Sequence, residues 1–227
     1  MSKRSMKRAQ GDTPRSTSPP PWAGTPFLAL VHEFNELFVE QVAEIARGDD
    51  LLTAPEMVRS HRELWAGLDA RARRSASRCP FLLADIQFRN QPWWQRVQYH
   101  AGGHPDSPPS AAPLFSPKPA VELTRDALIV AWSTARQDTR LAATLLAMSH
   151  EVARIVAQLG LSHLRHITDH HHHHLRPRWE HLSPFWGRLL TAAHNDDRDA
   201  LYTLHLQAFQ FADAGWDFAA SGSDATA

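Results

Sequence analysis

Apolar residues recur at intervals of three and four positions along most of this chain, and this spacing limits what the chain can fold into. The clearest run would lie on one face of a long helix: Phe27, Leu30, Val31, Phe34, Phe38, Val42 and Ile45. Gly48 follows the run and is expected to end that helix. No pair of segments shows the alternation of paired strands. The sequence therefore predicts an all-α fold.

Polar residues at four places predict where further helices begin. Thr53 and Glu56 have the spacing of a capping box, in which a hydroxyl and a carboxylate bind the first free N–H groups. Thr124 is predicted to cap the long helix of the second half of the chain. Ser149 and Ser162 are predicted to cap two shorter helices.

Eleven of the sixteen prolines fall in two short stretches that are also rich in small polar residues. Such composition cannot supply a packed core, so these stretches are predicted to be a tail and a linker. The expected organisation is a basic disordered tail, a first helical module, a proline-rich linker, a second helical module and a disordered tail: residues 1–26, 27–100, 101–121, 122–216 and 217–227.

A short sequence match relates the two predicted modules. Pro92-Trp93-Trp94-Gln95-Arg96 recurs as Pro184-Phe185-Trp186-Gly187-Arg188. One interpretation is a tandem duplication of a unit of about ninety residues. The alternative is independent convergence on a similar aromatic packing motif.

Tryptophan and arginine together are typical of the energetically dominant residues of protein interfaces. The residues around the two copies are therefore predicted to form an inter-module or partner-binding surface: Trp93, Trp94, Arg96, Trp179, Trp186 and Arg188.

Composition excludes several classes of protein. The 227 residues include only one cysteine, Cys79, so neither an intrachain disulfide framework nor a thiolate zinc finger can form. Formal charges balance to zero, which removes the general electrostatic argument for nucleic-acid binding. No apolar run approaches the roughly 20 residues that span a bilayer. We therefore expect a cytoplasmic protein without a membrane partner.

Residues 123–180 resemble the FlhD family of flagellar transcriptional regulators. The resemblance depends on Leu128-Ile-Val-Ala131, Gln137-Asp138, Leu141 through Met148, Glu151 through Leu159 and Arg178-Trp179. It implies an all-α, non-enzymatic subunit that dimerises and activates transcription with a second protein, FlhC. The family often has a cysteine where this chain has Leu175, so a dimer-linking disulfide is not implied here. Two such modules in one chain would form an intramolecular pseudo-dimer, and an ordinary dimer is the alternative.

Residues 141–170 have the helical pattern of a helix-turn-helix, whose polar faces would offer five side chains to DNA: Arg154, Gln158, His163, Arg165 and His166. Base recognition usually needs Arg, Lys, Asn or Gln near a helix N-terminus, and the first turns here offer few of these. We therefore expect DNA contact through a complex assembled with an FlhC-like subunit or another regulatory protein. Ordinary bundle helices with polar outer faces are the alternative.

Asp169 is followed by five consecutive histidines. If the helix continued through them, four imidazoles would share one face and could bind Zn²⁺, Ni²⁺ or Cu²⁺: His163, His166, His170 and His174. A low-complexity surface insertion would produce the same spacing by accident. A surface that responds to pH is a further alternative, because ordinary imidazoles titrate near pH 6.5.

No motif for catalysis is present in the sequence. Ser149-His150-Glu151 contains the residue types of a catalytic triad, but neighbours on one helix do not face a common reacting atom. The leading prediction is a non-enzymatic regulator resembling FlhD, with no cofactor. The alternatives are a histidine-rich protein that binds Zn²⁺ or Ni²⁺, and a helical adaptor without DNA or metal.

Overall fold

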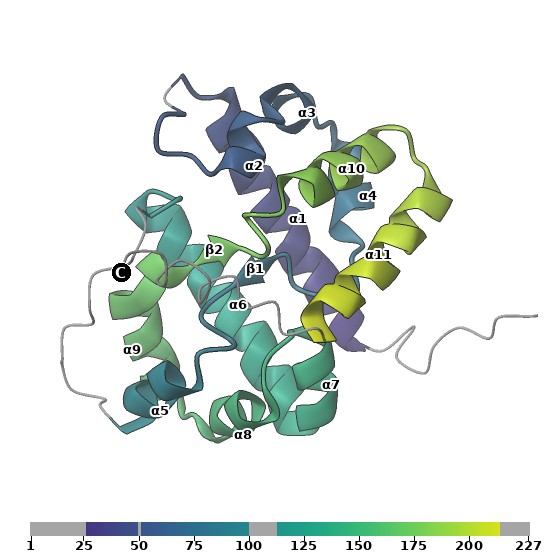
Figure 1. Ribbon diagram of the computed structural model, residues 1–227. Helices are drawn as coiled ribbons and strands as arrows, with labels where there is room; N and C mark the ends of the chain where they lie inside the picture. The colour runs from purple at the N-terminus through teal and green to yellow at the C-terminus, as the bar shows by residue number, and fades with distance from the viewer. Residues whose placement is uncertain (1–25, 50, 100–112, 214–227) are drawn as a thin grey trace, which may run out of the picture.

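The computed structural model describes residues 26–49, 51–99 and 113–213, which fold mainly into helices (Figure 1). This confirms the all-α prediction. The predicted tails and most of the predicted proline-rich linker lie outside the described residues. None of the described helices combines the length and the apolar character that a membrane crossing requires.

The first half, residues 26–99, begins with the long helix that the apolar spacing predicts. Its elements are α1 (Pro26–Arg47), α2 (Glu56–Arg59), α3 (Arg62–Ala66), α4 (Ala70–Ser77), β1 (Ala84–Asp85) and α5 (Gln91–Tyr99). Val31, Phe34, Phe38 and Val42 form the buried face of α1. Gly48 follows the last helical residue, as expected.

The second half, residues 113–213, also begins with a long helix. Its elements are α6 (Pro117–Gln137), α7 (Thr139–Leu145), α8 (His150–Gln158), α9 (Leu161–His171), the 3-10 turn η1 (His172–His174), β2 (Arg176–Pro177), α10 (Ser183–His194) and α11 (Arg198–Asp213).

The start of α6 corrects the sequence prediction. The helix begins at Pro117, inside the predicted linker, and Thr124 is a buried residue in its interior rather than its cap. Pro117 and Pro119 lie in the first turn, where a backbone N–H has no carbonyl partner within the helix, so proline removes no hydrogen bond there.

Of the other three predicted caps, one is correct and two are wrong. Ser149 caps α8 as predicted, because its Oγ accepts a hydrogen bond of 3.1 Å from the Val152 N–H. Ser162 is not a cap, since α9 begins one residue earlier, after Gly160. The capping box at Thr53 is also wrong, because Pro55 precedes α2 and no side chain caps that helix.

A short strand pair joins the two halves, which the sequence did not indicate. β1 pairs with β2 in antiparallel register, Ala84 opposite Pro177 and Asp85 opposite Arg176. Two residues are too few to show an alternating apolar pattern in the sequence. Ala84 and Arg176 are 92 positions apart in the sequence, as are Asp85 and Pro177. Each residue of β1 therefore pairs with the equivalent of its neighbour, which is the register that a two-fold axis between equivalent strands produces.

The same offset of 92 relates the turns that follow the strands. Gln87 and Trp179 both have a positive φ, at 54° and 52°. Trp94 donates its indole N–H to the Gln87 carbonyl at 2.9 Å, and Trp186 donates to the Trp179 carbonyl at 3.3 Å. Left-handed backbone is uncommon for such residues, so its recurrence at matched positions marks a shared local structure.

The buried faces of α1 and α6 also match at this offset. Seven buried positions of α1 each have a buried position of α6 located 92 residues later: Leu28 and Ala120, Val31 and Leu123, Asn35 and Ala127, Phe38 and Val130, Val39 and Ala131, Val42 and Thr134, and Ala43 and Ala135. The residue types differ in six of these seven pairs, while burial agrees in all seven. The two halves therefore share an arrangement that their sequences show in only a few positions.

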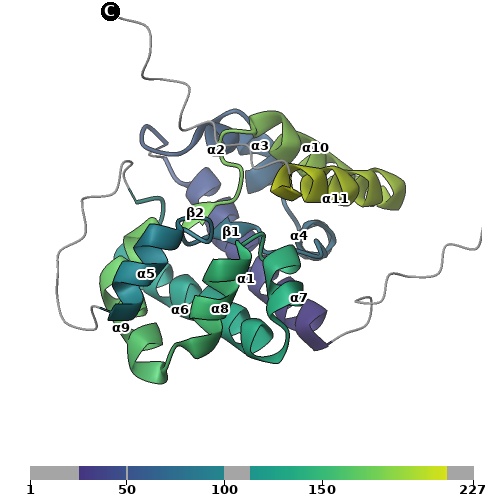
Figure 2. The same cartoon turned by 60° about the horizontal axis from the view of Figure 1, so that its bottom comes forward.

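Each half gives one helix to the other. α5 packs against α8 and α9 of the second half, while α10 packs against α2, α3 and α4 of the first (Figures 1 and 2). The two long helices, α1 and α6, also pack against each other. One continuous hydrophobic core contains residues of both halves, so the predicted modules are packed together rather than spaced apart.

The C-terminal helix α11 packs against α10 and brings a histidine to the core. The rings of His205 and Phe81 lie 6.0 Å apart between centroids. Burial, the larger cause, and the nearby His32 together lower the pKa of His205 to about 4. The Nε2 atom of His205 is buried without a hydrogen-bond partner. This histidine is therefore held in its neutral form.

Candidate metal centre

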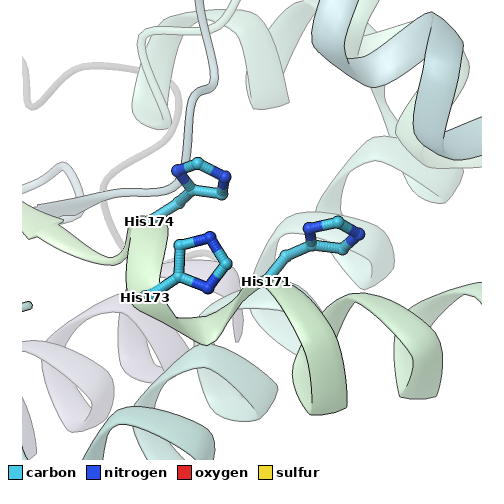
Figure 3. Close-up of side chains that lie close together, drawn as sticks. All are labelled: His171, His173 and His174. Carbon is cyan, nitrogen blue, oxygen red and sulfur yellow. The ribbon is translucent and has the colours of Figure 1, made fainter. Parts of the chain in front are cut away.

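Three imidazoles gather where α9 ends and β2 has not yet begun (Figure 3). His171 is the last residue of α9, and His173 and His174 belong to η1. The Leu175 N–H donates to the His172 carbonyl at 3.1 Å and closes this turn. Pro177 disfavours a helical conformation at Arg176, so the helix cannot continue toward β2. The turn therefore redirects His173 and His174 toward His171.

The spacing of the three rings suits a single metal ion. One nitrogen from each of His171, His173 and His174 lies within 4.8 Å of the others. Zn²⁺ binds histidine nitrogens at about 2.0–2.1 Å, which places the nitrogens of a tetrahedral site about 3.3 Å apart. A zinc ion at this cluster would hold the three nitrogens at that spacing. A fourth coordination position would remain for water or another ligand.

The three histidines are largely shielded from solvent and lie at a helix C-terminus, which favours a cation. His171 is 5% exposed, and the other two are half-buried. Carbonyl groups at a helix C-terminus carry partial negative charge, and the cluster lies at the C-terminus of α9. Trp93 of α5 covers the cluster, with its ring centroid 5.5 Å from that of His171 and 5.4 Å from that of His174.

The structure corrects the metal-ligand set predicted from the sequence. His163, His166 and His170 lie on α9, but α9 ends at His171, so His174 does not continue their helical face. His166 and His170 lie one turn apart with ring centroids 4.6 Å from each other. His163 instead accepts a hydrogen bond of 3.3 Å from the Gly160 N–H through Nδ1. Only His174 belongs to both the predicted set and the observed cluster.

His171 and His173 were missed by the sequence prediction. The prediction extended the helical spacing through the whole histidine run, whereas the last three histidines form a 3-10 turn. The one available signal was Pro177, which restricts the residue before it and so predicts that the helix ends ahead of Arg176.

The residues predicted to contact DNA lie on two helices of the second half. Arg154 pairs with Glu151 on α8, and Gln158 accepts a hydrogen bond of 3.5 Å from the Gln98 amide of α5. His163, Arg165 and His166 lie on α9, where Arg165 is exposed and the two histidines are half-buried. Their role in DNA contact stays a prediction.

Burial excludes the partner alternative for three of the six residues of the predicted inter-module or partner-binding surface. Trp93, Trp94 and Trp186 are buried, at 3%, 0% and 0% exposure, and cannot meet a second protein. Trp93 and Trp186 do lie between the halves. Trp93 contacts His171 of α9, and the ring of Trp186 lies tilted against that of Trp65 of α3, with centroids 5.6 Å apart. The inter-module alternative therefore describes them correctly. Of the remaining three, Trp179 is half-buried, and Arg96 and Arg188 are exposed.

A serine–histidine pair lies at the other joint between the halves. His61 Nε2 is 2.9 Å from the Ser183 carbonyl oxygen and 3.2 Å from its Oγ. A carbonyl only accepts, so Nε2 carries the proton in the shorter contact and cannot take one from the hydroxyl. A Cβ at Gly187 would lie 2.5 Å from the His61 ring, so glycine permits this approach. The pair is thus a structural contact between α10 and the first half.

The single thiol is also a packing residue. Cys79 is fully buried, and its Sγ donates to the Ala76 carbonyl at 3.2 Å. Burial raises the pKa of this thiol far above its ordinary value, which leaves it protonated. Cys79 is therefore neither a reactive nucleophile nor a ready metal ligand.

Comparison with known proteins gives no relative on which to base a function. No protein-family model, curated protein or solved structure matches the chain.

Proposed function

We propose that the protein binds a first-row transition metal ion through His171, His173 and His174. The observation that carries the proposal is the convergence of three imidazole nitrogens within 4.8 Å around a buried histidine. Imidazole suits Zn²⁺, Ni²⁺ and Cu²⁺, whereas Ca²⁺ and Mg²⁺ need oxygen ligands. The proposal assigns binding to this cluster and no catalysis.

The constant offset of 92 positions between equivalent residues of the two halves argues against the alternative of a low-complexity insertion. An insertion would lengthen the second half relative to the first. Ala72 of α4 and Leu164 of α9 are both buried and differ by 92 positions, and the left-handed residues Gln87 and Trp179 beyond the run keep the same difference. The histidines therefore take the place of residues that the first half also has.

The test is isothermal titration of the untagged full chain, stripped of metal, with ZnCl₂ at neutral pH. The wild-type protein should bind one ion with micromolar or tighter affinity. His173→Phe with His174→Leu should abolish this binding, because two of three ligands are lost. His163→Ala with His170→Ala is the matched control and should bind as the wild type does. Equal zinc binding by both double variants would contradict the proposal.

A second candidate function is favoured by the two-fold arrangement of the halves. We propose that the chain can act as a non-enzymatic transcriptional regulator resembling FlhD, in which the two halves take the place of a dimer. The matched strand register and the exchanged helices α5 and α10 support such a pseudo-dimer and a tandem duplication. DNA contact would occur in a complex with an FlhC-like subunit or another regulatory protein.

Recovery of the untagged protein from its own cells at moderate salt tests this second candidate. The proteins recovered with it are identified, and the bound DNA is sequenced with and without nuclease treatment. An FlhC-like subunit together with discrete promoter fragments is the expected result. Light scattering should show a monomer. Recovery of neither partner nor DNA, or a stable dimer of the chain, would contradict it.

A further inference from the structure

The histidine cluster lies where the two halves meet. Its ligands come from α9 and η1 of the second half, but the aromatic ring that covers it belongs to α5 of the first half. Trp93 is buried and lies nearly perpendicular to His171 and His174, at interplanar angles of 85° and 78°. The cluster therefore has its aromatic cover only when α5 is docked.

The attachment of α5 differs from the attachment of its counterpart. α10, which corresponds to α5 at the offset of 92, is held by packing of the tilted Trp65 and Trp186 rings and by the His61–Ser183 contact. α5 is held partly through Trp93, whose neighbours include two polar rings. The polar imidazoles of His171, which is buried, and His174, which is half-buried, give less hydrophobic stabilisation than packed apolar rings.

We propose that the metal ion acts as a lock that holds α5, and with it the first half, on the second half. The inference rests on the proposed metal binding. Without Trp93 over it, the turn His172–His174 loses its cover, and the three nitrogens lose the arrangement that suits one ion. The ion then binds the docked state more tightly than the undocked state, and by linkage it stabilises docking to the same extent.

Hydrogen–deuterium exchange of the full chain, with and without ZnCl₂, tests the lock. The readout is the exchange of the amides of α5, with those of α10 as the internal reference. At a zinc concentration about 100 times the dissociation constant, exchange in α5 should slow by up to about a hundredfold if the undocked state binds no metal. Exchange in α10 should change much less. The His173→Phe, His174→Leu variant should show no response in α5.

The outcomes separate this inference from the function on which it rests. Zinc binding with slower exchange confined to residues 171–175, or equally slow exchange in α5 and α10, would overturn the lock and leave metal binding in place. Calorimetry that detects no zinc binding would overturn both the lock and the proposed metal binding. Slowing in α5 well beyond that in α10, lost in the double variant, would establish the lock.

Discussion

Residues 79–83 lead into β1 and residues 171–175 lead into β2, at positions that differ by 92. In the first half the corresponding segment is apolar and buried: Cys79, Pro80, Phe81, Leu82 and Leu83. In the second half it is a run of four histidines before Leu175, which is buried like Leu83. Two segments with the same place in the architecture thus have opposite chemistry.

The first-half segment shows what this position contributes to stability. Phe81 packs edge-to-face against Trp179 and Phe209, with ring centroids 5.3 and 5.7 Å away. Full burial of one such side chain contributes about 1.5–3 kcal/mol. Apolar residues therefore stabilise the fold at the first-half position. Histidines that replace such residues, and converge on one another, are better explained by binding than by packing.

The tryptophans after the two strands test whether the halves are equivalent. Trp94→Ala and Trp186→Ala should each lower the free energy of unfolding by about 3–5 kcal/mol, because each removes a fully buried indole and its hydrogen bond. Urea unfolding of both variants measures the effect. A loss in one variant less than half that in the other would break the equivalence.

Exchange of residues between the two segments should have unequal effects. Phe81→His should lower the free energy of unfolding by about 2–4 kcal/mol, because it places a polar ring in an aromatic cluster. His173→Phe, in metal-free protein, should change it by less than about 1 kcal/mol, since His173 is only half-buried. Chemical denaturation in the presence of a chelator checks both values, and similar losses would contradict the comparison.

Acid should lower the free energy of unfolding through His205. This residue contacts Phe81 of the first half and has a pKa lowered to about 4. Between pH 6.5 and about 4 the unfolded chain holds the proton and the folded chain does not, so stability falls as the pH falls. The loss from this residue is at most about 3 kcal/mol. His205→Gln should flatten the dependence of urea midpoints on pH in this range, and an unchanged dependence would exclude His205 as its source.

Helix caps give the smallest contrast between the halves. Ser149→Ala should cost about 1 kcal/mol, since it removes the hydrogen bond from the Val152 N–H at the start of α8. Thr53→Ala should change stability by less than about 0.5 kcal/mol, because Thr53 is exposed and does not cap α2. Thermal unfolding of the two variants measures the difference, which vanishes if Thr53 is a cap after all.

The sequence predicted the helices well and the site poorly, for physical reasons. Apolar spacing reports which face of a helix is buried, so α1 and the cap at Ser149 were predicted correctly. Spacing does not report where a helix becomes a 3-10 turn, and His171 and His173 were missed for that reason. Burial of Trp93 depends on α5 crossing to the other half, a tertiary event that no local pattern contains.

The central claim is that the second-half segment is a metal site and the first-half segment is not. Anomalous diffraction at the zinc absorption edge, from crystals of zinc-loaded protein, tests it most directly. The account predicts one peak bound by nitrogens of His171, His173 and His174, under the ring of Trp93, at about 2.0–2.1 Å from each nitrogen. A peak at His166 and His170 alone, or no ordered zinc at the turn, would contradict it.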